Sequence, residues 1–270
     1  MAVVSDFTAV LFDNDAFRWN GARPLTTPVI VTYSFDDRAA ELPLESEYPD
    51  KVIGDFTTGF ANAAQQTTVR DALAIFAAAA GIRFVEVETG GMIQFVDATS
   101  ITSNGVVVSF ADIPSVNASF ASIGHVVMNQ AHFALGQGNA GFQILLHELG
   151  HAVGLDHSDG GTTTLTANLN VPANTVMKSF SSGEIIADIG LFDKQALASL
   201  YGATDAFNLD QLTIVADVIN GEIDITGTAG ADKFVAPNFD TNIAAGDGAD
   251  TIFGSEAADE INGEAGDDIL

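Results

Sequence analysis

Residues 227–270 repeat with a period of nine. They divide into five consecutive blocks, each with an apolar residue at its eighth position. Four blocks have Asp at the sixth position, and three of these also have Gly at the fourth. The aspartates are Asp232, Asp250, Asp259 and Asp268, and the glycines are Gly230, Gly248 and Gly266. Such a nonapeptide predicts a parallel β-roll, in which turns offer oxygen ligands to calcium and short strands bury the apolar side chains.

The two edges of this predicted roll are not equally complete. Two blocks make one coil, so residues eighteen apart stack, and the first, third and fifth blocks place their aspartates along one edge. On the other edge, Thr241 occupies the sixth position of the second block and Ala257 replaces a turn glycine of the fourth. We therefore expect several Ca²⁺ ions, mainly between the complete rows. An acidic disordered tail is the alternative, but it has no reason to keep its apolar residues in register.

The acidic charge of the chain is concentrated in the same region. Of 36 acidic and nine basic residues, 15 acidic and one basic follow Ala203. We therefore expect one domain over residues 1–203, a linker or the start of the β domain over 204–226, and an incomplete roll over 227–270. A net charge of -27 argues against nucleic acid as a partner. Because the chain has no Cys, any metal must be held by His, carboxylate or carbonyl groups.

Residues 1–203 combine strand-like and helix-like patterns. β-Branched and aromatic residues are dense in five segments that we predict to be strands, at 29–35, 82–87, 92–96, 105–110 and 125–128. Apolar residues recur at helical spacing in three segments, at 67–80, 140–153 and 191–201. The combination predicts an α+β domain with a mixed sheet and long helices. No run reaches the ~18 apolar residues of a transmembrane segment, and the N-terminus lacks the pattern of a secretory signal peptide.

The most informative segment of this domain is HELGHAVGLDH, residues 147–157. On a helix, His147 and His151 lie one turn apart on the same face and can bind one tetrahedral ion. Gly154 allows a sharp turn with positive φ, so that His157 can return as a third ligand. Three His ligands leave the fourth position of a zinc ion to water, which is typical of a catalytic site. Glu148 adjoins that position as a candidate general base. A surface helix with satisfied histidines explains neither the glycine nor the third His.

Together these motifs resemble the serralysin group of the metzincin zinc endopeptidases, secreted bacterial proteases with RTX-type calcium-binding repeats behind the catalytic domain. Softer matches follow in the family's order, at residues 19–21 with 31–35, at 124–129 and at 193–202. The resemblance implies a metzincin catalytic domain of α+β class followed by a β-roll, one catalytic Zn²⁺ and a methionine turn at Met177 beneath it. It also implies an edge strand that binds substrate. The residues of that strand would be His125, Val126, Val127, Met128 and Asn129.

Two positions depart from the family pattern. The resemblance implies a Tyr two residues after the methionine, which hydrogen-bonds the oxyanion in the transition state, but this chain has Ser179. Loss of such a donor without a replacement costs on the order of 2.7–4 kcal/mol in the transition state. The second departure is Ser158, where Pro often follows the third His. That change alters the loop and leaves the ligand intact.

The function that we expect is hydrolysis of protein or peptide substrates by a monomeric zinc endopeptidase, with Glu148 as base and water as nucleophile. Two alternatives stay open. One is a calcium-dependent surface or adhesion module with a weakly active or structural zinc site, which Ser179 favours. The other is a protease with one dedicated target, for example at a cell surface.

Calcium also indicates the location of the protein. Repeat sites with an affinity of about 10⁻⁴–10⁻³ M fill only where calcium is abundant, so we expect a secreted or cell-surface protein. The resemblance implies export without an N-terminal signal peptide, through a signal beyond Leu270. We therefore expect the chain to be a piece of a longer protein, whose repeat array continues to a capping unit.

Overall fold

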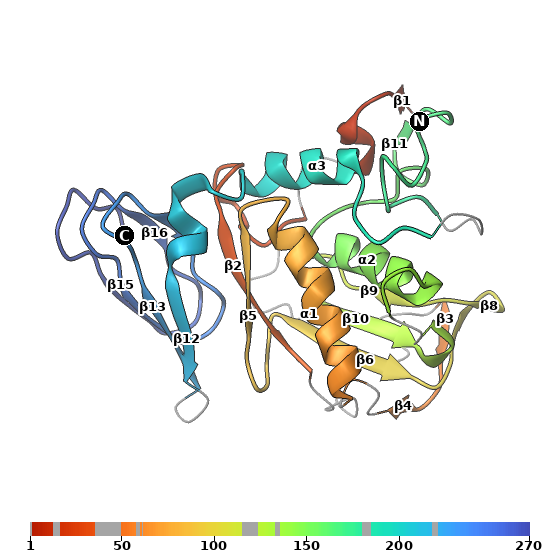
Figure 1. Cartoon of the computed structure of the whole chain (residues 1–270), viewed down its shortest axis with the longest axis horizontal. Helices are drawn as coiled ribbons and strands as arrows, with labels where there is room; N and C mark the ends of the chain where they lie inside the picture. Colours follow the sequence, from red (N-terminus) through yellow and green to blue (C-terminus); the bar gives the residue numbers. More distant parts are fainter. Residues whose placement is uncertain are drawn as a thin grey trace.

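The computed structural model describes residues 2–12, 17–35, 50–57, 60, 62–114, 124–132, 136–179, 185–217 and 221–270. These form two parts that lie side by side (Figure 1). The larger part mixes helices with a sheet, and the smaller part, blue in Figure 1, is a coil of short strands. None of the helices in the described ranges is long and apolar enough to cross a membrane.

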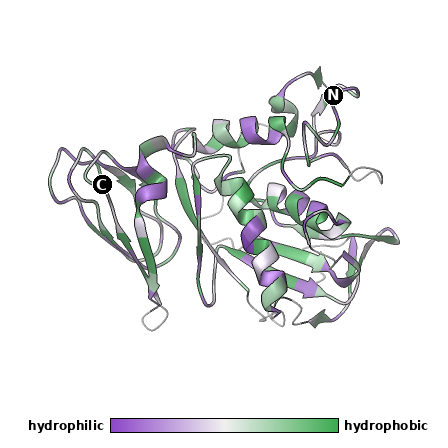
Figure 2. Cartoon of the chain, viewed as in Figure 1, coloured by the Kyte–Doolittle hydropathy of each residue, from purple (hydrophilic) through white to green (hydrophobic). Residues whose placement is uncertain are grey.

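One eight-stranded sheet runs through the larger part. Its members are β2 (Val29–Ser34), β4 (Phe56–Thr57), β5 (Ile82–Glu86), β6 (Ile93–Ala98), β9 (Phe110–Ala111), β10 (Gly124–Asn129), β14 (Lys233–Val235) and β16 (Thr251–Phe253). The order is β16-β14-β2-β6-β10-β9, with β5 also paired to β2 and β4 to β6. Strands β2, β5, β6 and β10 pair in parallel, and hydrophobic residues predominate along them (Figure 2). Strands β2, β6 and β10 are almost entirely buried, as parallel strands covered on both faces are, while β5 is only partly buried.

Four of the predicted strands are confirmed with shifts of one or two residues, as β2, β5, β6 and β10. The fifth prediction, residues 105–110, is wrong as a single strand. It is divided between β8 (Val106–Val107) and β9. Strand β8 belongs to a separate three-stranded sheet with β7 (Ile101–Ser103) and β3 (Lys51–Ile53). The break follows from a change of partner, because β8 pairs with β7 and β9 pairs with β10.

The segment expected to form the substrate-binding edge, residues 125–129, is not an edge. Strand β10 is parallel to β6 on one side and antiparallel to β9 on the other. Within the described residues the outer strand of the sheet is therefore β9. The composition of the segment explains its central position. The run Val126–Val127–Met128 has no polar face, which is typical of a central parallel strand.

In the part of the chain that the structure describes, three α-helices accompany the sheet: α1 (Ala63–Ala77), α2 (Ala140–Ala152) and α3 (Leu191–Tyr201). Helix α1 packs against β5 and α2, and α2 packs against β9 and β10. The predicted bounds of α2 and α3 are confirmed to within one residue. The bounds predicted for α1, 67–80, are displaced. The helix begins at Ala63 because the Asn62 side chain accepts a 2.9 Å hydrogen bond from the backbone N–H of Ala64 and caps it there.

The smaller part is a β-roll. Four strands form one of its faces: β12 (Thr213–Asp217), β13 (Glu222–Thr226), β15 (Thr241–Ala244) and β17 (Asp259–Asn262). Thr241 lies beside Asp259 in a parallel register of eighteen residues, as the nonapeptide period predicts. The opposite face is β14 with β16, and its Phe234 and Ile252 are fully buried in the roll core. Much of the segment 204–226 is thus strand that pairs within the roll.

The roll and the larger part share backbone pairing. Strand β14 continues the central sheet, where Val235 pairs with Val29 of β2 and its N–H donates to the carbonyl of Pro28 at 2.9 Å. At the other end of the molecule, β1 (Ala2–Val4) pairs with β11 (Thr163–Leu165). Three short 3₁₀ helices lie wholly within the described residues: η1 (Phe7–Val10), η5 (Gln130–His132) and η6 (Ala206–Gln211).

Candidate metal centres

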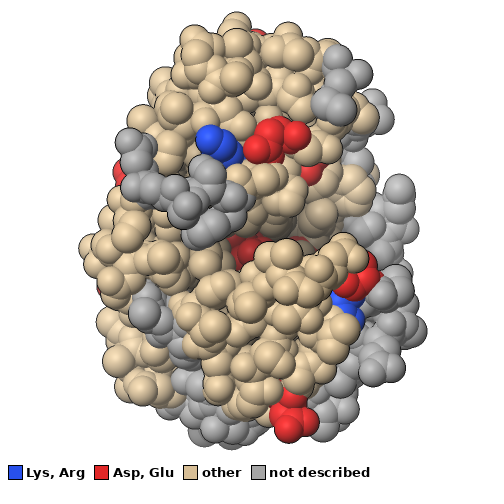
Figure 3. Space-filling model, turned by 90° about the vertical axis from the view of Figure 1, so that its right-hand side faces the viewer, with Lys and Arg blue, Asp and Glu red and all other residues tan. Residues whose placement is uncertain are grey.

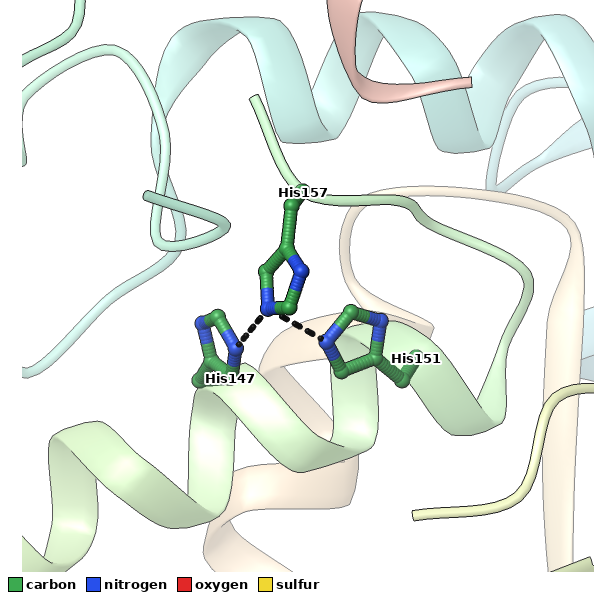
Figure 4. Close-up of side chains that lie close together, drawn as sticks. All are labelled: His147, His151 and His157. Atoms are coloured by element: carbon green, nitrogen blue, oxygen red, sulfur yellow. Dashed lines mark hydrogen bonds between the residues drawn. The ribbon is translucent and has the colours of Figure 1, made fainter. Parts of the chain in front are cut away.

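Helix α2 presents two histidines on one side. Its apolar residues anchor the opposite side in the main core. These residues are Phe142, Leu145, Leu146 and Leu149. His147 and His151 are one turn apart, and their rings point towards the segment that follows the helix (Figure 4). The amphipathic pattern of α2 therefore fixes the direction of both imidazoles.

The chain reverses at Gly154 and returns over α2. Gly154 has φ +96°, and a Cβ atom there would lie 2.1 Å from the carbonyl oxygen of Phe17. Only glycine fits both the left-handed backbone and the close approach. The N–H of Leu155 donates to the carbonyl of Gly150 at 2.8 Å, which closes the helix end. The positive φ that the sequence predicted is confirmed, and it brings His157 above the first two histidines (Figure 4).

The three imidazoles converge on one point through their Nε2 atoms. The Nε2 of His157 lies 3.1 Å from that of His147 and 3.2 Å from that of His151 (dashed lines in Figure 4). Two nitrogens bound to one tetrahedral zinc ion at 2.0–2.1 Å stand about 3.3 Å apart. The observed separations therefore fit a zinc ion, and the three predicted ligands are brought together.

Backbone carbonyls hold two of the rings in the ligand tautomer. The Nδ1 of His147 lies 2.9 Å from the carbonyl oxygen of Val176, and the Nδ1 of His151 lies 2.8 Å from that of Leu155. Since a carbonyl only accepts, each Nδ1 carries the proton and each Nε2 offers a lone pair. Burial lowers the pKa of His147 to about 4 and holds the pKa of His151 well below its usual range. Both rings are therefore neutral, as metal ligands must be.

Glu148 is buried next to the first ligand. Its side chain is 6% exposed, and burial raises its pKa to about 8, an effect that nearby Lys51 opposes. A divalent cation at the His cluster favours the ionised carboxylate. The face that lies on the right of Figure 1 is drawn in Figure 3. A hollow runs across it, and acidic atoms lie on the floor of the hollow. A carboxylate sequestered beside a metal is suited to exchange protons with a metal-bound water.

Met177 packs against α2, in a turn that is also bonded to the residue after the third ligand. Its side chain is fully buried, and a Cβ atom on Gly150 would lie 2.3 Å from its Sδ. The N–H of Ser158, the residue after the third His, donates to the carbonyl of Met177 at 3.0 Å. The position predicted for a methionine turn is therefore occupied by a turn that contacts the segments of all three histidines.

The two departures have defined partners. Ser158 is fully buried, and its hydroxyl donates to the side-chain oxygen of Asn170 at 2.8 Å. The residue that stands where Pro was expected therefore makes a buried hydrogen bond. Ser179 donates both its N–H, at 3.1 Å, and its hydroxyl, at 2.5 Å, to Oδ1 of Asp159. Its side chain is thus directed to Asp159 and supplies the His cluster with no equivalent of a tyrosine hydroxyl.

The residues expected to bind substrate are mostly internal. Val126, Val127, Met128 and Asn129 are buried in β10, and Asn129 donates its side-chain amide to the carbonyl of Ile101. His125 is 13% exposed and lies 2.8 Å from Asp112, Nδ1 to Oδ2. Four of the five therefore stabilise the sheet rather than line a cleft.

The roll stacks its aspartates as predicted. The N–H of Asp232 donates to Oδ1 of Asp250 at 2.8 Å, and the N–H of Asp250 donates to Oδ1 of Asp268 at 3.0 Å. The turn glycines are stacked too, since a Cβ atom on Gly248 would lie 2.8 Å from the carbonyl of Gly230, and one on Gly266 would overlap the carbonyl of Gly248.

Two carboxylate oxygens of the roll are buried without a hydrogen-bond partner: Oδ2 of Asp250 on the complete edge and Oδ1 of Asp259 on the other. A buried charged oxygen without a donor is costly unless a cation compensates it. The Asp259 side chain also accepts from the N–H of Ser255 at 2.7 Å. Both edges therefore carry oxygens suited to calcium.

Asp193 was not among the predicted site residues. It is fully buried at the start of α3, three residues after Gly190, whose N–H donates to its carboxylate at 2.8 Å. An acidic residue at this helical position is a signal for N-terminal capping. Its further contact with Val176, at 2.7 Å, joins segments seventeen residues apart and has no sequence signal.

Comparison with known families identifies one part of the chain. Residues 238–270 match a family model that describes four copies of the RTX calcium-binding nonapeptide repeat. No curated protein matches the chain. The C-terminal part is therefore a calcium-binding RTX β-roll, of a kind typical of secreted proteins.

Proposed function

We propose that this chain is a zinc-dependent endopeptidase of the serralysin-like metzincin type, with a calcium-stabilised roll. The observation that carries the proposal is the convergence of three Nε2 atoms beside a buried glutamate on the same helix. His147, His151 and His157 would hold the ion. When bound, zinc supplies a Lewis acid that polarises a carbonyl and lowers the pKa of its water to about 7.

Residues of the chain orient the metal ligands and transfer the proton. The carbonyls of Val176 and Leu155 keep the protons of His147 and His151 on Nδ1, so both ligands stay neutral and oriented. Glu148 takes the proton of the attacking water on a carboxylate oxygen and returns it to the nitrogen of the leaving amine. Its burial on α2 limits the access of bulk water to that transfer.

The substrate would lie along β9, the outer strand. Because the N–H of Asp112 is directed inward to the carbonyl of His125, the alternation of an antiparallel pair directs the backbone groups of Ala111 outward. An extended peptide could pair with these groups as an added strand. This edge is supported as the substrate site by the packing of α2, the helix of His147 and His151, against β9. Backbone pairing of this kind accepts many side chains.

We further propose that the protein acts outside the cell. The roll supplies carboxylates that repel one another unless calcium neutralises them, and calcium at the required concentration is found there. This part of the proposal rests on the RTX match.

A second candidate is a calcium-dependent surface module whose zinc site is structural. It is favoured by Ser179, which is engaged with Asp159 and offers no donor to an oxyanion. A protease restricted to one target is a variant of the first candidate. Like the surface module, it would cleave general substrates such as casein weakly.

The deciding experiment measures zinc content and cleavage of casein and of a peptide library, with and without a zinc chelator. Glu148→Gln should keep its zinc and lose about 10²–10⁴-fold in turnover. Glu88→Gln, an exposed glutamate at the end of β5, is the matched control and should cleave normally. Chelator-resistant cleavage, or a fully active Glu148→Gln, would overturn the proposal. A wild-type protein that holds zinc and cleaves neither casein, library peptides nor extracellular proteins favours the surface module.

A further inference from the structure

The carboxylate of Asp193 is the centre of a buried hydrogen-bond network. Its Oδ1 accepts the hydroxyl of Thr175 at 2.6 Å, and its Oδ2 accepts the N–H of Val176 at 2.7 Å and that of Gly190 at 2.8 Å. The side chain is fully buried, so the three donors replace the water that the carboxylate loses.

The same turn reaches the histidines. Thr175 links Asp193 to the next peptide unit. Its hydroxyl donates to Asp193, and its Oγ1 accepts the N–H of Met177 at 2.9 Å. The carbonyl of Val176 then accepts the Nδ1 proton of His147. A single carboxylate therefore fixes the peptide unit that orients the first His.

We propose that Asp193 is a positioning residue of the metal centre, which holds the 175–177 turn so that His147 keeps its Nδ1–H tautomer and aims Nε2 at the ion. The proposal rests on the proposed zinc function, but it concerns a residue outside the ligand set. The plainer reading is that Asp193 only caps α3 through Gly190. The two readings differ, because a cap has no effect on the ring of His147.

A carboxylate is required because the turn presents only donors. Asparagine at 193 keeps the shape but has one acceptor oxygen. If that oxygen takes the place of Oδ2, it accepts both N–H groups and the NH₂ group faces the hydroxyl of Thr175, which loses its acceptor; in the other orientation the NH₂ group faces both N–H groups. Asp193→Asn therefore leaves at least one donor unpaired and releases the turn. The matched control is Asp188→Asn, an exposed carboxylate near the same helix that pairs with Lys194.

The first measurement is zinc affinity, by competition with a chromophoric chelator, together with the visible spectrum of the Co²⁺-loaded protein. We expect Asp193→Asn to bind Zn²⁺ about 10- to 100-fold more weakly and to change the Co²⁺ spectrum, with Asp188→Asn unchanged. Equal affinity and an unchanged spectrum in Asp193→Asn would overturn the proposal.

The second measurement needs no metal. Long-range ¹H–¹⁵N NMR of the His147 ring reports its tautomer in the metal-free protein. The wild type and Asp188→Asn should hold the Nδ1–H form, and Asp193→Asn should populate both forms. If the wild type binds no zinc, the proposed function fails, and the tautomer alone decides the role of Asp193. If Asp193→Asn does not fold, Thr175→Val removes one donor with little change in shape and should shift the tautomer in the same direction; an unshifted ring there counts against the proposal.

Discussion

The Sδ atom of Met177 lies against Gly150, at a position where a Cβ atom on the glycine would approach it to 2.3 Å. Because the Met177 side chain is fully buried, it cannot move aside without repacking the core. Gly150→Ala should therefore destabilise the protein by about 1–3 kcal/mol and weaken zinc binding through the adjacent His151. Urea unfolding measures the first effect. The double variant Gly150→Ala/Met177→Ala should be less destabilised than the sum of the single variants, and strict additivity would refute the contact.

The turn at Gly154 should tolerate no side chain. Gly154→Ala would combine the cost of a left-handed backbone, about 1–2 kcal/mol, with a collision against the Phe17 carbonyl, and it should displace His157. Gly138→Ala is the matched control, since Gly138 has φ +83° with open space around it and carries only the conformational cost. Zinc affinity and the free energy of unfolding of the two variants are compared. Equal losses in both would show that the close approach at Gly154 has no effect.

Calcium removal should loosen the roll and spare helix α2. Without cations, the stacked carboxylates of Asp232, Asp250 and Asp268 repel one another. Helix α2 packs in the main hydrophobic cluster, whereas the core of the roll is a separate cluster. Hydrogen exchange with and without a calcium chelator should show lost protection in residues 227–270 only. Asp250→Asn should weaken the calcium response, and Glu260→Gln, exposed on β17, should not. Unchanged exchange in the roll after chelation contradicts the prediction.

Stability should depend on pH through the pair of Glu86 and Arg70. The Arg70 guanidinium, 2.7 Å away, holds the pKa of Glu86 below its ordinary value of 4.5. The pair therefore stabilises the fold above that pH and loses its effect as pH falls below it. Both groups are partly exposed, so the contribution is about 1 kcal/mol or less. Thermal unfolding should separate Glu86→Gln from the wild type at pH 7, and the difference should shrink steadily as the pH is lowered below 4.5, with Glu88→Gln as control. A difference that does not shrink with pH would show that packing, not charge, is responsible.

The local and periodic features could be predicted from the sequence. The nonapeptide period placed Asp232, Asp250 and Asp268 in one stack, and the structure confirms it through their mutual hydrogen bonds. The spacing of His147, His151 and His157 likewise predicted a cluster, because helical geometry and one glycine turn are enough to bring them together. In both cases a short stretch of chain carries all the information.

Only the tertiary structure decided which strand is the edge of the sheet and what holds the His cluster. The order β6-β10-β9 results from long-range pairing, so the segment expected at the edge proved to be central. The contact of Asp193 with Val176 joins helix α3 to a loop, and that of Ser179 with Asp159 joins two loop segments. No periodicity encodes such contacts, because they depend on how the packed core brings distant backbone segments within hydrogen-bond distance.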